Sequence, residues 1–352
     1  MLNSLFIRNY RNLKELRIDS IDRINLIAGK NNTGKSSLLE AIYIYFTNGQ
    51  PESIWQIIKG RGESGNTHTI SSLSSLFTDR FTNDSIIIGE ALSKKRVELK
   101  IVNYIDEVET QNSGEIIQRK KNISNDQLHN YKNYKTGFEI RIEDSSLFVD
   151  AQGLNIISNP IKFSQYFNAS FVKAGAFAAN EKLFDSIALT PKENFVVEAL
   201  KIIEPKTERI AFVAEENSFA RKAVIKLSDQ SNVLPLQSMG DGMNRVLSII
   251  LALVNAENGL LLIDEFENGL HYSVQKQLWK IIFDLAKSLN IQVFATTHSN
   301  DCISSFEAVL NNPKNTVKGK LIRLDNIAGV IKPIEYTPEE LEIAIENDIE
   351  TR

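Results

Sequence analysis

Two stretches of the sequence decide the fold: Gly29-Lys30-Asn31-Asn32-Thr33-Gly34-Lys35-Ser36 and, much further along the chain, Leu260-Leu261-Leu262-Ile263-Asp264-Glu265. The first matches the phosphate-binding pattern Gly-x4-Gly-Lys-Ser/Thr. It follows the apolar run 24–28 and precedes a helical run from Ser36, which is the strand–loop–helix context that this motif requires. A chance glycine-rich turn is the alternative, and the context argues against it. The second stretch predicts a buried strand that ends in two carboxylates.

The parts of the first loop have distinct roles in holding a triphosphate. Gly29 and Gly34 let the backbone amides face inward, and the following helix presents its positive end to the phosphates. Lys35 is expected between the β- and γ-phosphates, and the Ser36 hydroxyl is expected to ligate Mg²⁺. The loop therefore predicts ATP and Mg²⁺ as cofactors, although it reads phosphates and not the base. The residues expected to contact the nucleotide are Gly29, Lys30, Asn31, Asn32, Thr33, Gly34, Lys35, Ser36 and Ser37.

The acidic pair and a later histidine complete the predicted chemistry. Asp264 is expected to join Ser36 in the Mg²⁺ shell, and Glu265 to position and deprotonate the attacking water. The alternative is that both acids cap a strand at the surface. His298 follows two threonines at the end of the apolar run 291–296, where it can contact the γ-phosphate or the attacking water. Lys35, Glu265 and His298 form the predicted catalytic set.

A serine–glycine block precedes the second strand. Ser238-Met239-Gly240-Asp241-Gly242 opens the predicted helix 242–254. With the other motifs, this order resembles the ABC-type ATPase heads of the RecF, SMC and overcoming-lysogenization-defect (OLD) proteins. The resemblance covers almost the whole chain. It is carried by residues 6–13, 29–36, 238–242, 264–271 and 297–299, and it is closest to the small OLD-like bacterial AAA ATPases that lack a TOPRIM domain.

The resemblance implies a nucleotide-sandwich homodimer, with higher assembly left open. Ser238, Gly240 and Gly242 of one subunit would cap the nucleotide held by Lys35 of the other. The sequence departs from the commonest ABC signature at Met239, where that signature has Gly, and at Asp241, where it has Gln. Gln165 is the nearest candidate for the glutamine that reports the nucleotide state in other heads.

The expected fold is α/β: an ABC-type P-loop NTPase head with a mixed central sheet, an antiparallel β subdomain and a helical lobe. A first lobe comprises 1–59 and 255–336, a β-rich insertion 60–159, and a helical signature lobe 160–254. Together 1–336 form one head. Residues 337–352 are expected to form an acidic C-terminal helix with a capping box at its start.

Composition and charge limit the expected location of the protein and its expected binding partners. The 352 residues are 42% hydrophobic and 24% charged, with a net charge of -4 and one cysteine, Cys302. No apolar stretch approaches the roughly 20 residues of a membrane span, so we expect a cytoplasmic protein without a membrane partner. Basic residues cluster in 90–141. Such a cluster is typical of a surface that binds nucleic acid, and also of solvated strands whose charged side chains prevent pairing with another chain. Double-stranded DNA is therefore a candidate ligand.

The leading hypothesis is an ATPase that senses nucleic acid or an invader. It would control a separately encoded effector, expected to be a nuclease, in a defence-type system. The first alternative is a RecF-like factor that binds DNA in an ATP-dependent way. The second is a scaffold that ATP assembles without essential hydrolysis. The resemblance supplies the leading role, because motif spacing alone does not distinguish the three.

Overall fold

The chain forms two compact units. The computed structural model describes residues 1–63, 70–91, 93, 95–110, 116–123, 125–131, 133–143, 145–150, 168–174, 180–214 and 221–352. What we call the P-loop unit comprises Met1–Asn3, Ser20–Leu39 and Phe167–Arg352, and what we call the β unit comprises Ser4–Asp19 and Glu40–Tyr166. Within the described ranges, no helix has the length and apolar character needed to cross a membrane.

A six-stranded mixed sheet forms the centre of the P-loop unit. Its order is β16-β15-β3-β14-β13-β9, and all neighbours are parallel except β15 and β16. The strands are β3 (Ile24–Ala28), β9 (Ala169–Val172), β13 (Leu260–Ile263), β14 (Gln292–Thr296), β15 (Gly319–Ile327) and β16 (Val330–Tyr336). Because β3, β14 and β13 are adjacent and parallel, the loops at their carboxyl ends meet at one edge of the sheet. The predicted mixed sheet is confirmed.

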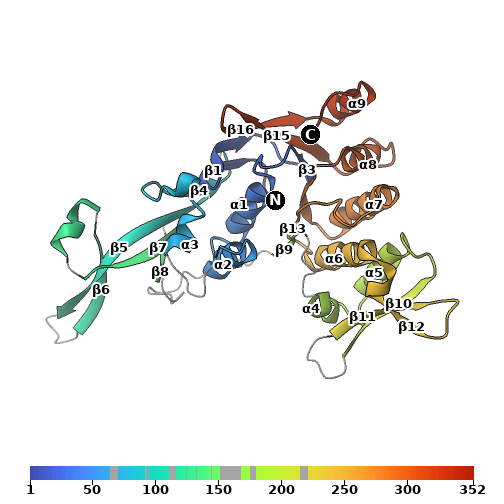
Figure 1. Cartoon of the computed structure of the whole chain (residues 1–352), viewed down its shortest axis with the longest axis horizontal. Helices are drawn as coiled ribbons and strands as arrows, with labels where there is room; N and C mark the ends of the chain where they lie inside the picture. Colours follow the sequence, from blue (N-terminus) through green and yellow to red (C-terminus); the bar gives the residue numbers. More distant parts are fainter. Residues whose placement is uncertain are drawn as a thin grey trace. The chain divides into compact units, whose positions relative to one another are not determined.

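Helices pack along this sheet and bury its apolar strands. In Figure 1, α6 (Asp241–Asn255), α7 (Tyr272–Ser288) and α8 (Asn300–Leu310) lie side by side in chain order. The core between them contains a stack of Phe266 on Trp279, with ring centroids 4.0 Å apart, and Phe306 edge-on to Trp279 at 5.1 Å. The carboxyl-terminal helix α9 (Pro338–Glu346) contacts α8 and begins with the predicted capping box of Thr337 and Glu340.

The remaining part of the P-loop unit precedes α6. A small antiparallel sheet contains β10 (Thr207–Ala214), β11 (Arg221–Leu227) and β12 (Val233–Pro235). The sequence from Arg209 to Asp229 predicts a strand hairpin, and the pairing of β10 with β11 confirms it. The short helix η3 (Leu236–Met239) leads from β12 to α6. Two further helices, α4 (Asn180–Asp185) and α5 (Lys192–Leu200), pack against α6.

The β unit contains an antiparallel sheet, as expected for a meander with alternating apolar residues. Its order is β2-β1-β4-β5-β7-β8, and β6 also pairs with β5. The strands are β1 (Leu5–Tyr10), β2 (Leu13–Ile18), β4 (Ile86–Gly89), β5 (Arg96–Thr110), β6 (Ile116–Ile123), β7 (Lys135–Ile142) and β8 (Ser145–Asp150). The helical segments are the later part of α1 (Lys35–Phe46), α2 (Pro51–Gly60), α3 (Ile70–Ser74), η1 (Thr78–Arg80) and η2 (Asn125–Asn130).

A buried ionic cluster ties the β1–β2 turn to the helices of the β unit. The Arg11 guanidinium lies 2.9 Å from Glu40 Oε2 and donates to both carboxylate oxygens of Glu63, at 2.8 and 3.0 Å. Arg61 Nε donates to Glu40 Oε1 at 2.7 Å, and the Tyr10 hydroxyl donates to Glu40 Oε2 at 3.2 Å. Glu40 is buried, so its charge is compensated inside the unit rather than by solvent.

The stretch from Gly60 to Ser75 is rich in Gly, Ser and Thr, which predicts an exposed loop, and this prediction is wrong in part. Helix α3 occupies the end of that stretch, and Leu73 is 2% exposed. Leu76 is buried as well. Burying these two leucines is favourable, and it outweighs the tendency of the nearby glycines and serines to form an exposed loop. Gln165, the candidate for the glutamine that reports the nucleotide state, lies outside the described residues. So do His68 of the stretch from Gly60 to Ser75 and two basic residues of 90–141, Lys94 and Lys132.

Candidate functional site

The loop between β3 and α1 has the backbone that its glycines predict. Gly29 has φ of +149°, and a Cβ there would lie 2.7 Å from both Leu324 O and Thr33 Oγ1. Gly34 has φ of +86°, a conformation that favours glycine. The Thr33 hydroxyl closes the turn by donating to Lys30 O at 2.8 Å. Only glycine fits the first position, so the local sequence fixes the curl of the loop.

Lys35 is the first residue of α1 and points back into this loop. Its ammonium donates to Gly29 O at 2.7 Å and to Lys30 O at 2.9 Å. Burial lowers the pKa of Lys35, while the nearby carboxylates of Asp264, Glu267 and Glu265 act in the opposite direction. Of the other predicted loop residues, Asn31 and Asn32 are exposed and Ser37 is buried in the first turn of α1.

Ser36 and Asp264 come together as predicted for a cation site. The Ser36 hydroxyl donates to Asp264 Oδ1 at 3.1 Å. Thr296, at the end of β14, donates to the same oxygen at 2.6 Å. Across the described ranges, no group of three or more His, Cys, Asp or Glu side chains could hold a metal. One hydroxyl and one carboxylate fit Mg²⁺, which takes few protein ligands and completes its shell with water and phosphate oxygens.

The backbone at Glu265 is held in a left-handed conformation. Its φ is +49°, which is uncommon for a side chain other than glycine. The amide of Glu265 donates to the Thr296 hydroxyl at 2.8 Å. Arg245, in α6, donates from Nη2 to Asp264 O at 2.6 Å and to Glu265 O at 2.7 Å, and from Nη1 to Lys173 O at 3.1 Å. Two side chains, Thr296 and Arg245, therefore fix the main chain of the carboxylate pair through three hydrogen bonds.

Arg245 and Thr296 are site residues that the sequence reasoning did not single out. Arg245 is the only basic residue of α6, next to the apolar run that begins at Val246. A lone cation at the edge of a buried helix face is the signal that could have found it. Thr296 carries no comparable signal, because its partners, Asp264 and Glu265, lie in the loop after β13.

His298 pairs with Glu267, an acidic residue of the stretch 264–271 that carries the family resemblance. Glu267 Oε1 accepts from the His298 amide at 2.7 Å and lies 3.1 Å from His298 Nδ1. The imidazole is half exposed, whereas Glu267 is largely covered, with 10% of its side chain accessible. The acid thus orients the ring while the remaining nitrogen, Nε2, stays available to a ligand.

The carboxyl-terminal residues reach this region of the P-loop unit. Lys30 Nζ lies 3.0 Å from Glu350 Oε1. Arg352 Nη1 donates to His298 O at 3.3 Å. Thr351, the residue between Glu350 and Arg352, is buried. Both ion-pairing side chains at Lys30 and Glu350 are more than half exposed, so this contact stabilises the fold weakly.

The serine–glycine block lies at the start of α6. Ser238 lies within η3 and is exposed, and its hydroxyl donates to Pro235 O at 2.7 Å. Gly240 has φ of +90° and caps α6, whose first amides are unsatisfied by any capping side chain. Gly242 lies in the first turn, where a Cβ would come within 3.1 Å of Gly269 O. No hydrogen bond between described residues links this block to the P loop.

Other side chains of the stretches 264–271 and 90–141 have local roles. His271 caps α7, accepting from Ser273 N and lying 2.8 Å from the Ser273 hydroxyl. In the basic stretch 90–141, the cations of Lys95 and Arg96 lie over the Tyr45 and Phe6 rings, at 5.8 and 5.4 Å from the centroids. These two cations stabilise the β unit through cation–π contacts.

Comparison with known proteins identifies the family. A family model described as "AAA domain, putative AbiEii toxin, Type IV TA system" matches residues 24–303. The chain belongs to this family. It is an ATPase of the AAA type with a P-loop NTPase fold.

This AAA-domain chain is also similar to individual relatives and solved structures. It is 24% identical to an "ATP/GTP phosphatase" of Helicobacter pylori over 99% of both chains. Local matches reach the Rad50 ATPase of Archaeoglobus fulgidus (35% identity over 26% of this chain and 10% of the relative) and RecF of Oenococcus oeni (51% over 12% of each). An SMC head solved with the C-winged helix domain of ScpA has a TM-score of 0.53, at 13% identity over 98% of this chain and 99% of the other. The SMC-like head fold is thus confirmed.

Proposed function

We propose that this ATPase hydrolyses ATP with Mg²⁺ at composite sites of a homodimer, as a regulatory ATPase that controls a separately encoded effector. The hydrogen-bonded set of Ser36, Asp264 and Thr296 beside Lys35 carries the chemical part of the proposal. In this scheme Lys35 neutralises the β- and γ-phosphates and Ser36 with Asp264 holds Mg²⁺. Glu265 then accepts the proton of the attacking water.

The start of α6 supports the composite site. Exposed Ser238 and the uncapped amides after Gly240 form an anion-binding end of a long helix. In a nucleotide sandwich this end caps the γ-phosphate held by the other subunit. Because Arg245 of the same helix holds the carbonyls of Asp264 and Glu265, docking at the start of α6 bears directly on the position of the catalytic carboxylate.

A mixing experiment tests the composite site. Lys35→Ala and Ser238→Arg are each expected to abolish ATP turnover as homodimers. Mixed together they form a heterodimer in which one site combines the intact P loop of one chain with the intact α6 start of the other. We expect turnover to return on mixing, toward one quarter of the wild-type rate if subunits exchange freely.

Controls make the outcome decisive. Ser238→Arg should still bind ATP, because its own P loop is unchanged, and Lys35→Ala should not. If mixing restores no turnover although light scattering shows that the two chains associate, the site is complete within one chain and the assignment of residues 238–242 is wrong.

The biological role rests on the family description, which names a toxin of a type IV toxin–antitoxin system, and on the resemblance to OLD-like ATPases. We infer a defence-type role in which the ATPase controls an effector nuclease. Copurification of an effector with Glu265→Gln, which should hold ATP without hydrolysing it, tests that role. If no effector copurifies, whether ATP is present or absent, the proposed role is contradicted.

DNA binding is the alternative that a specific observation favours. The local matches to RecF proteins and to a Rad50 ATPase are to proteins named for DNA repair. Under this alternative, duplex DNA should raise ATP turnover in the absence of any effector. Turnover that is indifferent to duplex DNA at low salt would exclude it, because phosphate contacts are strongest there.

A further inference from the structure

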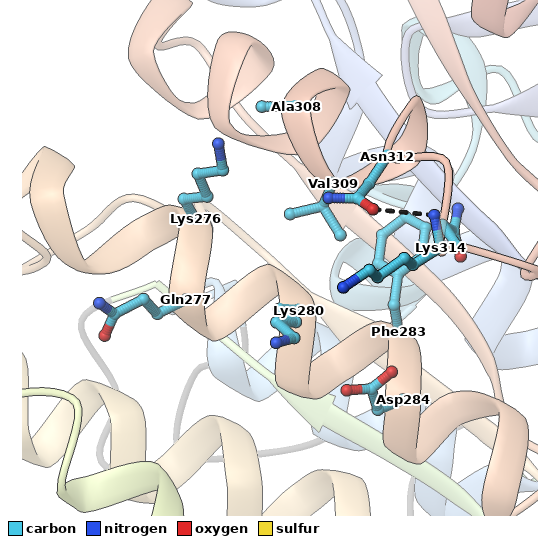
Figure 2. Close-up of a pocket in the computed structure, with 10 residues that line it drawn as sticks. Lys276, Gln277, Lys280, Phe283, Asp284, Ala308, Val309, Asn312 and Lys314 are labelled. Carbon is cyan, nitrogen blue, oxygen red and sulfur yellow. Dashed lines mark hydrogen bonds between the residues drawn. The ribbon is translucent and has the colours of Figure 1, made fainter.

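A groove between α7 and α8 lies on the P-loop unit outside the nucleotide site. It encloses about 360 Å³, within the roughly 300–1,000 Å³ typical of ligand sites. Figure 2 shows its lining: Lys276, Lys280 and Asp284 follow one another along α7, and Lys314 comes from the segment after α8. The groove therefore combines an enclosed volume with a rim of charged side chains.

The rim is predominantly positive. Lys276, Lys280 and Lys314 are all exposed, and Asp284 is the one carboxylate among the lining residues. None of the three lysines forms an ion pair with another described residue. Three ammonium groups around one small volume repel each other unless an anionic ligand compensates them.

The floor of the groove is apolar and rigid. Phe283 is 2% exposed and Val309 is 7% exposed. Phe283 packs edge-on to Trp279 and tilted against Phe306, with centroids 6.4 and 5.7 Å apart. Ala308 lines the α8 side with a small side chain. Such a floor favours an apolar group of the ligand, which a sugar–phosphate backbone does not offer.

We propose that this groove binds an acidic segment of a partner protein, which inserts one apolar side chain between α7 and α8 and places flanking carboxylates against the lysines. A nucleic acid would satisfy the lysines but would offer no apolar side chain to the floor. The groove lies on the two helices that start at the loops of Glu267 and His298. It is therefore suited to a partner that responds to the nucleotide site.

The inference extends the proposed control of an effector but does not depend on it. Peptide binding can be measured with Lys35→Ala, in which ATP chemistry plays no part. Failure of the mixing experiment and failure of peptide binding are thus separate results.

The probe is a short fluorescein-labelled peptide with a central leucine flanked by glutamates, and binding is followed by fluorescence anisotropy. We expect saturable binding. It should weaken by at least about ten-fold in Lys276→Glu/Lys280→Glu and by a similar factor when serine replaces the leucine. Ala308→Trp, which fills the groove without changing charge, should weaken it as much. Lys332→Glu, an exposed lysine on β16, is the matched control and should bind normally.

Three results would overturn the proposal. The first is no saturable binding up to about 1 mM peptide. The second is binding that Ala308→Trp leaves unchanged, because charge alone would then explain it. The third is a preference of the groove for duplex DNA, shown by DNA binding that the double lysine variant loses and Lys332→Glu retains.

Discussion

Thr296 links the two acidic residues of the site through one hydroxyl. It donates to Asp264 Oδ1 and accepts from the amide of Glu265, so it orients the predicted metal ligand and the main chain of the predicted base together. The sequence predicts both acids, since they stand as a pair directly after one apolar strand. It does not predict Thr296, because a threonine at a strand end is common and its partners are far away in sequence.

Thr296→Val removes these two hydrogen bonds and keeps the side-chain shape. A lost hydrogen bond to a charged group costs about 1.5–3 kcal/mol, so we expect kcat to fall by roughly ten- to a hundred-fold. ATP affinity should change little, because the P loop is intact. Steady-state kinetics and a direct ATP-binding titration measure the two effects separately.

The neighbouring residue is the matched control. Thr297 is also fully buried, but its hydroxyl accepts from Ser299 N near the start of α8. Thr297→Val should therefore reduce kcat less than Thr296→Val does. Equal losses in the two variants would show that general packing, and not the contact with Asp264, is responsible.

Helix α6 is the element that connects the serine–glycine block to the carboxylate pair. The apolar run after Gly242 predicts this helix, and the structure confirms it as Asp241–Asn255. Its link to the loop after β13 is invisible in the sequence, because Arg245 reaches main-chain carbonyls, which no residue pattern reveals. Local motifs were thus predictable here, and the contact that joins them was not.

Arg245→Met keeps the length of the side chain and removes its three carbonyl contacts. We expect ATP binding to persist while kcat falls by about a hundred-fold, since Glu265 loses its fixed position. The pH profile of any residual turnover should flatten if the base no longer holds the water. Unchanged kcat in a folded variant would show that Thr296 alone fixes the loop.

The ionic cluster of the β unit makes a pH-dependent contribution to stability. Burial raises the pKa of Glu63, but hydrogen bonds from Arg11 and Ser75 outweigh it and lower the pKa below its ordinary 4.5. A carboxyl with a lowered pKa stabilises the fold above pH 4.5, and this contribution is lost as the pH falls through the folded-state value. Acid should therefore weaken the β unit.

Glu63→Gln should reduce the dependence of stability on pH below about 4.5. The free energy of unfolding, from urea titrations at several pH values, should fall less steeply with acid than in the wild type. Glu15→Gln, an exposed acid on β2 of the same unit, should leave the slope unchanged. If both variants behave alike, the Arg11–Glu63 pair contributes nothing specific.

At the scale of the whole molecule, we expect dimer formation to depend on bound ATP. Glu265→Gln removes the proposed base and keeps the phosphate and metal contacts. With ATP and Mg²⁺, we expect this variant to accumulate as a dimer in light scattering, whereas the wild type returns to monomer as ATP is consumed. A mass that is independent of nucleotide in both proteins would oppose an ATP-driven sandwich.

Only some strands of the central sheet can be predicted from the sequence. Strands next to chemical motifs were predictable, because β3 and β13 lead directly into the P loop and the acidic pair. Edge strands β9 and β16 carry little signal of their own, and their places depend on pairing with residues distant in sequence. The order of strands in a sheet is a non-local property, so the sequence favours a mixed sheet without fixing its edges.

The left-handed backbone of Glu265 sets stability and activity against each other. A residue other than glycine costs of order 1 kcal/mol in that conformation. A selection for heat resistance alone should therefore favour glycine or asparagine at position 265 and silence the enzyme. Thermostabilised versions of this ATPase should be screened for turnover at every round, since the most stable variants at this position will be the inactive ones.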